Sequence, residues 1–483
     1  MKVLSQNFNS ASKAALLNDD LRSALDRAEG GFVNTRKKAV AELRNFEDYR
    51  TYGQQVKDHT LKHLGYYLTQ FETKVAKSGG QVHWAENGEQ ANKIILDICS
   101  AADTQKITRK ITKGKSMVSE EAATNKSLQE HGYEVIETDL GEYIIQLARE
   151  SPSHIIAPAV HKSKQNVTDL FHAHHSKLGF SEKVTEPEDI VNQARRILRD
   201  HFCSADVGIT GANFLVADTG SAVIVTNEGN GDLTASLPNV HIIISSIEKV
   251  IPDLVSLGGF LRLLGRSATG QVMSVYTTLF NGPKRKDDLD GPDQFHVVLL
   301  DNGRTEILKS KYRDILRCIR CGACLNHCPV YANIGGHAYG WVYPGPIGSV
   351  LTPLLVGQTK AMHLPNACTL NGRCQTVCPV KIPLPSLLRQ HRVDLVKMGA
   401  HSWAQKFGLW CWYSLASRPK RYNQITRIFI TILARLQSLK STATRGRFRW
   451  LPLARPWTAT RDFPTPAQST FQQLWKARHS HKT

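Results

Sequence analysis

The sequence predicts an α/β domain followed by a small module that is rich in cysteine. Between about 66 and 305, short apolar runs typical of strands alternate with segments of helical periodicity, the order found in α/β folds. Between 318 and 378 lie seven of the ten cysteines, in two runs that each end in Cys-Pro. A chain of 483 residues has room for two or three domains. We therefore expect the chain to divide into four segments, 1–65, 66–305, 306–400 and 401–483.

The elements expected along the first two segments follow from periodicity and turn signals. Residues 1–65 are charged and carry apolar side chains at helical spacing, which predicts helices. The next segment predicts a helix in EQANKIILDICSAA and short strands in QVHWA, HGYEVIETDL, ITGANFLVADTGSAVIVTNEG, NVHIIISSIEKVI and QFHVVLLDNGRTEIL. Turn signals predict two reversals, an Asp-Thr-Gly turn at 218–220 and an Asp-Asn-Gly hairpin turn at 301–303.

The remainder of the chain combines a helix, a glycine-rich loop and an amphipathic segment. KYRDILR, at 311–317, predicts a helix that leads directly into the first cysteine run. The glycine-rich loop at 335–350 predicts close packing against a cofactor or a partner. Residues 401–440 predict a partly amphipathic helix. Its apolar face is expected to carry Ile425, Ile428, Phe429, Ile432, Leu433 and Leu436.

The first cysteine run has the spacing of an iron–sulfur site. It contains Cys318, Cys321, Cys324 and Cys328 followed by proline, the C-x2-C-x2-C-x3-C-P pattern of bacterial iron–sulfur proteins. In that pattern the first three thiolates bind one cluster and the fourth binds its neighbour. Structural zinc is a rival interpretation, but it commonly uses separated cysteine pairs. A disulfide framework is less favoured still, because the sequence shows no secretory signal.

The second cysteine run departs from this spacing. It contains Cys368, Cys374 and Cys378, and Asn371 stands where the pattern requires a cysteine. Crossed ligation predicts that Cys378 joins the first three cysteines of the first run, which gives cluster one four thiolates. The last cysteine of the first run joins Cys368 and Cys374 in cluster two, which is then one thiolate short. We expect cluster one to be 4Fe–4S, and cluster two to be 3Fe–4S or a 4Fe–4S cluster with a non-cysteine ligand.

Positive charge is concentrated towards residue 483. The chain has a net charge of +19, and residues 401–483 hold 15 lysines and arginines against the single acid Asp462. Six of the eight tryptophans fall in the same segment. Such a segment predicts contact with an acidic membrane surface or an acidic partner, with a solvated tail as the alternative. Binding to nucleic acid has no other support in the sequence.

The apolar runs of the chain are short. The first residues lack the apolar core of a signal peptide, and no run reaches the roughly 18 residues of a spanning helix. We therefore expect a cytoplasmic protein that is at most peripheral to the inner face of the membrane.

Several long segments resemble one known family, in the same order along the chain. They are KGKSMVSEE, ETDLGEYIIQL, PSHIIAPAVHKSK, TNEGNGDLTASLPNVHI, GGHAYGWVYPGPIGSVLTPLL and the two cysteine runs. Together they resemble the LutB family of lactate-utilisation iron–sulfur proteins, over about 30–450 of this chain.

The resemblance implies a fold and a role. Residues 66–305 are expected to form a lactate-utilisation domain with a fold similar to sugar isomerases and CoA transferases. Residues 306–400 are expected to form an α-helical ferredoxin-type module with two 4Fe–4S clusters. The implied role is in oxidising L-lactate to pyruvate, together with a cysteine-rich iron–sulfur subunit and a smaller lactate-utilisation-domain protein. Asn371 is where this chain departs from the two-cluster pattern.

Within the α/β segment, the best candidate for a catalytic or binding loop follows an apolar run. The loop at 226–232 contains Glu228, a candidate base or ligand contact, beside glycines that allow close backbone approach; a simple chain reversal is the alternative. Lys113, Lys115 and Ser116 are candidates for binding a carboxylate such as that of lactate, with solvated lysines as the alternative. GITGAN, at 208–213, matches a dinucleotide fingerprint poorly, so we expect no nucleotide site there.

Histidines and isolated cysteines carry weaker signals. His161, His172, His174 and His175 suggest a metal site, but a polar helix face is the favoured interpretation. The remaining cysteines are expected to be small buried residues rather than ligands. They are Cys99, Cys203 and Cys411.

The sequence is compatible with three functions. The favoured one is an iron–sulfur electron-transfer subunit of a complex that oxidises L-lactate and allows growth on lactate. The second is an isomerase- or transferase-like enzyme whose active unit is the α/β domain, with structural clusters. The third is a redox-sensing binding module.

Overall fold

The chain folds into two compact units, 1–397 and 398–483. The expected boundaries near residues 65 and 305 lie inside the first unit and remain predictions. The computed structural model describes residues 2–102, 109–400, 402–438, 446–451, 454–458, 461–467 and 469–480.

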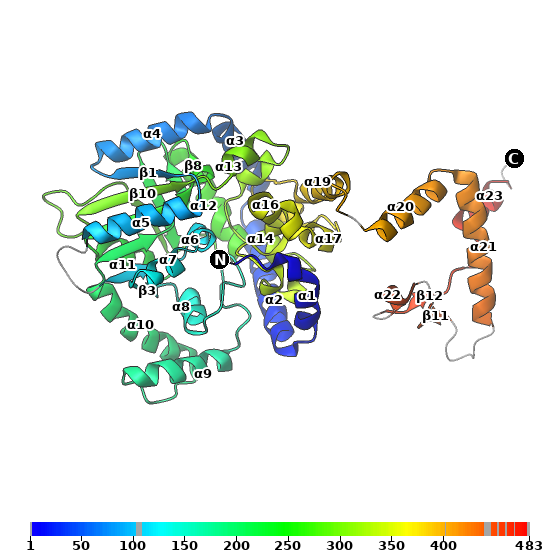
Figure 1. Ribbon diagram of the computed structural model, residues 1–483, viewed down its shortest axis with the longest axis horizontal. Helices are drawn as coiled ribbons and strands as arrows, with labels where there is room; N and C mark the ends of the chain where they lie inside the picture. Colours follow the sequence, from blue (N-terminus) through cyan, green and yellow to red (C-terminus); the bar gives the residue numbers. More distant parts are fainter. Residues whose placement is uncertain are drawn as a thin grey trace. The chain divides into compact units, whose positions relative to one another are not determined.

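A six-stranded parallel sheet forms the centre of the α/β part of the first unit (Figure 1). Every adjacent pair of strands runs parallel, so all six carboxyl ends lie along the same edge. The α/β architecture expected from the sequence is confirmed. In spatial order the strands are β1 (Gln81–Ala85), β10 (Gln294–Leu300), β7 (Val240–Ser246), β4 (Val207–Thr210), β2 (Lys110–Lys113) and β3 (Glu134–Glu137).

Both faces of this sheet are covered, as a parallel sheet requires. On one face, Ile242 and Ile244 share a buried apolar core with Ile95 of α5 (Gly88–Ala102). On the other face, Ile243 shares a separate core with Phe71 of α4 (Leu64–Lys77). Side chains alternate between the two faces of a strand, so a strand covered on both faces is apolar at consecutive positions.

A smaller, four-stranded sheet completes the α/β part. Its strands, in spatial order, are β8 (Val250–Ile251), β5 (Phe214–Val216), β6 (Ser221–Thr226) and β9 (Tyr276–Phe280). β5 and β6 are antiparallel, which confirms the predicted reversal at 218–220.

The prediction of a hairpin turn at 301–303 is wrong, because β10 is followed by the helix α13 (Arg304–Lys309). β10 is paired on both sides, with β1 and β7, so no edge remains for an antiparallel return strand. Gly303, with a φ of 85°, starts the helix, and the Asp301 side chain accepts the backbone N–H of Thr305 at 2.8 Å. The Asp-Asn-Gly residues at 301–303 therefore precede the start of a helix and do not form a hairpin turn.

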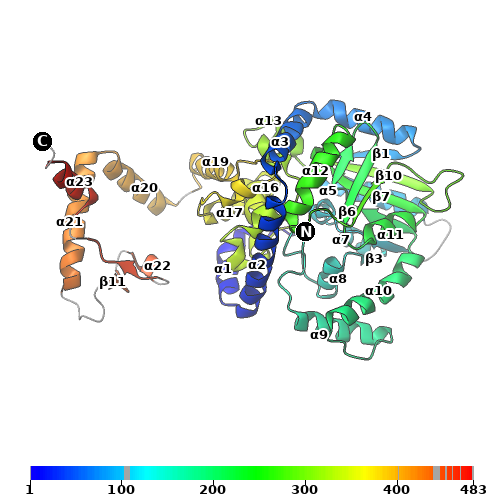
Figure 2. The same cartoon turned by 180° about the vertical axis from the view of Figure 1, so that it is seen from behind.

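Helices from both ends of the first unit pack around the cysteine runs (Figures 1 and 2). α1 contacts α17, and α2 contacts α14 and α15, so the predicted helices of 1–65 form one wall of the cysteine module. The predicted helix before Cys318 is a short 3-10 helix, Arg313–Arg317. The helices around the cysteine runs are α1 (Phe8–Leu16), α2 (Asp19–Ala41), α3 (Phe46–Lys62), α14 (Ala323–Asn326), α15 (Tyr331–Ile334), α16 (Gly345–Val356), α17 (His363–Ala367), α18 (Arg373–Val377) and α19 (Leu384–Lys397).

Further helices belong to the α/β part of the first unit. They are α6 (Met117–Ala122), α7 (Thr124–Glu130), α8 (Leu140–Leu147), α9 (Lys164–His175), α10 (Pro187–Ser204), α11 (Asn230–Ser236) and α12 (Leu254–Ala268).

The second unit consists of several short elements and one longer helix. They are α20 (Trp403–Ala416), α21 (Pro419–Ser438), β11 (Arg447–Phe448), α22 (Arg455–Thr458), β12 (Phe463–Pro464) and α23 (Phe471–Ser480). The apolar face expected on α21 is mostly unburied: Leu433 is 3% exposed, whereas Ile425, Ile428, Phe429, Ile432 and Leu436 are exposed. In the described part of the chain, no helix combines the length and apolarity needed to cross a membrane.

Candidate functional site

The two cysteine runs fold into loops with the same backbone conformation. Arg320 and Leu370, each two residues after the first cysteine of its run, have left-handed φ angles of 58° and 57°. Gly322 and Gly372, two residues further on, have φ angles of 72° and 82°, and each precedes a short helix, α14 or α18. Left-handed residues at matching positions make both loops turn in the same way.

Asn371 therefore occupies in the second loop the position that Cys321 occupies in the first. The backbone N–H of Arg373 donates to Asn371 Oδ1 at 3.1 Å, and that of Ala323 donates to the Cys321 sulfur in the corresponding way. The two positions differ in burial, because Cys321 is 7% exposed while Asn371 lies at the surface. The position that lacks a thiolate is thus open to solvent.

Four sulfurs meet in one cavity. Cys318, Cys321, Cys324 and Cys378 line it together with apolar side chains such as Ile347. Burial first, and then the neighbouring cysteines, raise the pKa of Cys324 well above its usual range. Thiols crowded in this way lose their protons when a metal binds them. This set is the one expected for cluster one.

The three remaining sulfurs of the runs form a second, more open group. Burial first, and then the charges of Cys368 and Cys328, raise the pKa of Cys374 to about 12. Cys328 and Cys374 are buried, but Cys368 is only partly covered and its loop is exposed at Leu370 and Asn371. This set is the one expected for cluster two.

Backbone N–H groups are directed at the sulfurs of both groups. Hydrogen bonds to sulfur stabilise negative charge on it and adjust the reduction potential of an iron–sulfur cluster. The seven sulfurs, their two groupings and these donors fit iron–sulfur clusters. The donor and acceptor pairs are Arg320 to Cys318 at 3.4 Å, Tyr331 to Cys328 at 3.5 Å, Leu370 to Cys368 at 3.3 Å and Ile382 to Cys378 at 3.4 Å.

Arginines from the amino-terminal helices hold the second cysteine run. Arg36 of α2 donates from Nη2 to the carbonyl of Val377 at 3.0 Å, and Arg50 of α3 donates from Nε to the carbonyl of Cys378 at 2.9 Å. Both arginines are buried. No local sequence pattern predicts these contacts, which join residues more than 300 positions apart.

A buried ion network connects the α/β part to the first cysteine run. Arg304 binds both carboxylate oxygens of Glu121 at 2.8 Å and approaches Glu248 at 2.8 Å. Arg320 pairs with Glu248 at 3.1 Å, and the Tyr343 hydroxyl donates to Glu121 at 2.7 Å. Burial alone would raise the pKa of Glu248, but the two arginines hold it at about 2. The network therefore fixes Arg320 beside the cysteines.

The glycine-rich loop at 335–350 packs against the α/β part. A β-carbon on Gly336 would lie 1.7 Å from the carbonyl oxygen of Ser153, so only glycine fits there. His337 bonds the carbonyl of Ser151 at 2.7 Å. The loop therefore packs closely against the PSHIIAP segment of the same chain, and its predicted contact with the clusters or a partner stays a prediction.

A second cavity, of about 260 Å³, lies at the carboxyl edge of the parallel sheet. Parallel sheets bind ligands at this edge because several strands end there side by side. Residues that follow β2, β3, β4, β6 and β7 line it. The charged lining residues are Lys115, Asp139, Glu228, Lys249 and Arg320.

Three of the four candidates named from the sequence of the α/β segment meet in this cavity. Lys115, Ser116 and Glu228 line it, and Glu228 is exposed and accepts the backbone N–H of Leu140 at 3.3 Å. Lys113 does not line it. Its fully buried ammonium group pairs with Glu137 at 2.8 Å, so Lys113 is a structural residue.

Lys249 and Arg320 also line this cavity and were missed in the sequence. Lys249 follows β7 and has no motif around it. Arg320 lies between two cysteines, and the cysteine spacing predicted a metal site there but no role for the arginine. Residues 210–213 of GITGAN line the cavity as well, although the segment does not match a dinucleotide motif.

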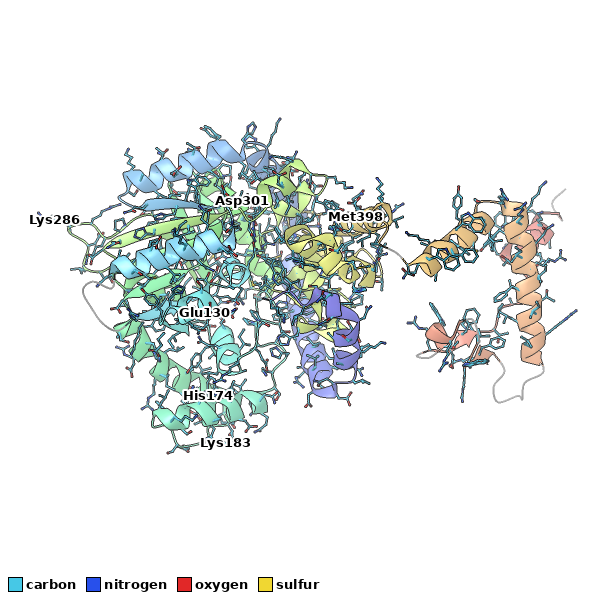
Figure 3. All side chains as sticks on the ribbon, in the orientation of Figure 1. Glu130, His174, Lys183, Lys286, Asp301 and Met398 are labelled. Carbon is cyan, nitrogen blue, oxygen red and sulfur yellow. The ribbon has the colours of Figure 1, made fainter. Side chains whose placement is uncertain are left out.

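A larger hollow, of about 900 Å³, opens between α5 and α7. It is lined by residues such as Glu130, which Figure 3 labels, and by none of the predicted site residues. Its walls contain no cysteine among the residues described.

The four candidate histidines do not form one group. His175 is buried and bonds Tyr143 and Gln193, each at 3.0 Å, so it is a core residue rather than part of a polar face. His174 lies on α9, away from the cysteine runs (Figure 3). His161 instead pairs with Glu150 at 2.7 Å.

Of the isolated cysteines, only Cys99 is buried, which confirms the prediction for that residue. Cys203, on α10, is exposed and Cys411, on α20, is partly exposed, so the prediction is wrong for both. Both lie on helices whose partly solvent-facing sides leave these positions uncovered.

The α/β sheet and the paired cysteine groups define an iron–sulfur protein that also contains an α/β domain. Residues 68–300 match the family model of the LUD domain, and residues 314–382 match that of the 4Fe-4S dicluster domain. The chain is 42% identical to "Lactate utilization protein B" of Lysinibacillus sphaericus, over 99% of this chain and 98% of that protein. It is 41% identical to the protein of the same name from Bacillus cytotoxicus, with the same coverage. The chain belongs to the lactate utilization protein B family.

A solved structure of a DUF162 family protein from Deinococcus radiodurans matches 49% of this chain and 98% of its own. Its identity is 12% and its TM-score is 0.27, too low to support a conclusion about the fold.

Proposed function

We propose that this chain is an electron-transfer subunit of a complex that oxidises L-lactate to pyruvate and so allows growth on lactate. The observation that carries the proposal is the pair of cysteine groups, one enclosed and one open, in a member of the lactate utilization protein B family. Oxidation of a 2-hydroxy acid releases two electrons, and iron–sulfur clusters accept and release electrons singly. Two clusters in one chain suit this task.

Cluster one would be 4Fe–4S, held by Cys318, Cys321, Cys324 and Cys378, which share one cavity. Cluster two would be held by the other three sulfurs of the runs. This cluster lacks a thiolate at Asn371, so we infer a 3Fe–4S cluster or a 4Fe–4S cluster with one iron bound by a non-cysteine ligand. The chain would then hold about seven or eight irons.

The remaining parts of the proposal concern partners and location. A cysteine-rich iron–sulfur subunit and a smaller lactate-utilisation-domain protein would exchange electrons and substrate with this chain. We also propose that the α/β domain shares its fold with sugar isomerases and CoA transferases. The complex would be cytoplasmic.

The second unit would dock on the acidic inner face of the membrane or on an acidic partner. On α20, Trp403, Trp410 and Trp412 are 77%, 62% and 60% exposed, in a segment with a large excess of positive charge. Exposed tryptophans beside basic residues suit an anionic interface. Replacing all three tryptophans with alanine should reduce cosedimentation with phosphatidylglycerol vesicles, whereas vesicles of phosphatidylcholine should bind little of either protein.

A second function is supported by the cavity at the carboxyl edge of the sheet. Glu228 and Lys115 there are suited to an isomerase- or transferase-like reaction in which the clusters are structural. Glu228→Gln would then abolish turnover and leave the iron content unchanged. A redox-sensing module, the third candidate, would show no steady reduction by lactate in the reconstituted complex.

Cys321→Ser tests the electron-transfer proposal. This substitution should abolish lactate-dependent growth while growth on glucose continues, because cluster one would lose a thiolate. Cys99→Ser, at a buried cysteine outside both groups, is the matched control and should retain growth. Normal growth of the Cys321→Ser strain on lactate would overturn the proposal.

A further inference from the structure

The cavity at the carboxyl edge of the sheet contains two lysines with unused hydrogen-bonding capacity. Lys115 Nζ donates to the carbonyl of Ile156 at 2.5 Å, and Lys249 Nζ donates to the carbonyl of Ala212. Among the residues that the structure describes, neither lysine forms an ion pair with a carboxylate. An ammonium group has three donors, and cations that are largely removed from water are ordinarily paired. Both lysines can therefore accept an anion.

Arg320 supplies a third cation and connects this cavity to cluster one. Arg320 lines both cavities, and its backbone N–H donates to Cys318 Sγ at 3.4 Å. Its Nη2 pairs with Glu248, while Nε and Nη1 have no hydrogen-bond partner within the described ranges. The guanidinium lies over the Tyr343 ring, 4.6 Å from its centroid, which restrains its orientation.

The size and the remaining lining of the cavity restrict what can bind. A volume of about 260 Å³ falls below the roughly 300–1,000 Å³ of sites for drug-sized ligands, so a dinucleotide does not fit. Glu228 is exposed and lines the cavity, where its carboxylate can accept a hydrogen bond from a hydroxyl group. The three cations outnumber the two carboxylates of the lining, Asp139 and Glu228, so the cavity matches a small carboxylate that also carries a hydroxyl.

We propose that this cavity binds a small 2-hydroxycarboxylate, with its carboxylate between Lys115, Lys249 and Arg320 and its hydroxyl directed to Glu228, and that its occupancy is coupled to the redox state of cluster one through Arg320. The choice of a 2-hydroxy acid rests on the proposed function. The coupling rests on the two cavities that share Arg320.

The sign of the coupling follows from charge. An anion bound at Arg320 offsets the positive charge that this residue presents to cluster one, so adding an electron to the cluster becomes less favourable. Coupling between two sites is reciprocal, so reduction of cluster one must weaken binding of the acid by the same factor. We expect about tenfold weaker binding, within the usual range of coupling between sites.

The first experiment measures binding to the anaerobically loaded full-length chain by isothermal titration calorimetry. L-Lactate should bind the oxidised protein at least about tenfold more tightly than propionate, which lacks the hydroxyl, and dithionite reduction should weaken lactate binding about tenfold. Equal binding of lactate, propionate and chloride would overturn the assignment of the ligand. Equal lactate affinity in both redox states would overturn the coupling.

Two variants locate the site. Lys249→Met should weaken lactate binding about tenfold or more by removing one cation, and Glu228→Gln should remove the preference for lactate over propionate. The matched control is Lys309→Met, at an exposed lysine of α13, which should bind like the wild type. Far-ultraviolet circular dichroism and iron content confirm that each variant is folded and loaded. Unchanged lactate binding in folded Lys249→Met would overturn the site.

A third variant tests the connection to the cluster. Arg320→Lys retains the positive charge but loses the planar guanidinium group that lies over Tyr343 and pairs with Glu248. Potentiometric titration monitored by EPR should show that lactate lowers the midpoint potential of cluster one in the wild type and shifts it less in this variant. An identical shift in both proteins would overturn the role of Arg320.

Failure of this inference and failure of the proposed function are distinguishable. If Cys321→Ser still supports growth on lactate but lactate binds as described, the electron-transfer role fails and the site stands. If growth is lost but lactate does not bind the wild type, the electron-transfer role stands and this site fails.

Discussion

The two cysteine runs have the same local backbone but different surroundings. The first run lies against the buried ion network of Glu121, Arg304 and Glu248, beside a cavity of the α/β part. The second run has an exposed loop at Leu370 and Asn371. One sequence pattern, repeated, thus gives an enclosed site next to a ligand cavity and an open site next to solvent. In the function proposed above, this difference suits an inner cluster coupled to a ligand and an outer cluster that exchanges electrons with a partner.

Loss of one thiolate should have the largest effect, and it should differ between the two groups. Cys324→Ser, in the enclosed group, should remove cluster one and about half of the iron, because a buried site offers no water to replace the lost ligand. Cys368→Ser, in the open group, should retain more iron, since solvent can reach that cluster. Iron and sulfide analysis of anaerobically purified protein measures both. Equal losses in the two variants would contradict the distinction between enclosed and open sites.

The buried ion network beside the first cysteine run should make the stability of the protein depend on single charged residues. Arg304→Met leaves Glu121 and Glu248 without their common partner and should lower the free energy of unfolding by about 3–5 kcal/mol. Lys309→Met on the same helix, where the lysine is exposed, should change it by less than about 0.5 kcal/mol. Urea denaturation under anaerobic conditions measures both values. Similar values for the two variants would show that the network contributes little.

The contact between the α/β part and the first cysteine run should depend on pH. Burial first, and then Lys115, lower the pKa of His154 to about 4, and its ring bonds Asn326 of α14 at 2.9 Å. Since the unfolded chain binds the proton more readily, stability is lost as the pH falls from about 6.5 towards 4, by up to about 3 kcal/mol.

The measurement for His154 is the urea midpoint as a function of pH. His154→Gln should flatten the dependence in this window, whereas His174→Gln, on α9 away from the cysteine runs, should leave it unchanged (Figure 3). An identical pH dependence in wild type and His154→Gln would refute the assignment.

Asn371→Cys should have the smallest effect on stability, because the position is exposed, and the most specific effect on the spectrum. It restores the missing thiolate at the position equivalent to Cys321, so any 3Fe–4S EPR signal should give way to a 4Fe–4S signal. Asn366→Cys, at another exposed asparagine nearby, is the control and should leave the spectrum unchanged. An unaltered spectrum in Asn371→Cys would mean that another group already completes cluster two.

The sequence by itself determined the features that depend on neighbouring residues. Cysteine spacing predicted two sulfur groups, and the structure places Cys378 with the first run and Cys328 among the sulfurs of the second. Apolar runs predicted β1, β3, β7 and β10 of the parallel sheet, and the signal is continuous in β7 and β10 because burial on both faces requires it. β2 was not predicted. The loop containing Glu228 was found because it follows such a run.

Only the tertiary structure decided which distant residues meet. Arg36 and Arg50 reach the second cysteine run, and Lys249 and Arg320 meet Lys115 at one cavity. The turn at 301–303 was predicted wrongly because the local Asp-Asn-Gly signal carries no information about β10 having partners on both sides. Strand pairing and charge contacts join residues far apart in the chain, so their free energies depend on the assembled fold and leave no pattern in a short stretch of sequence.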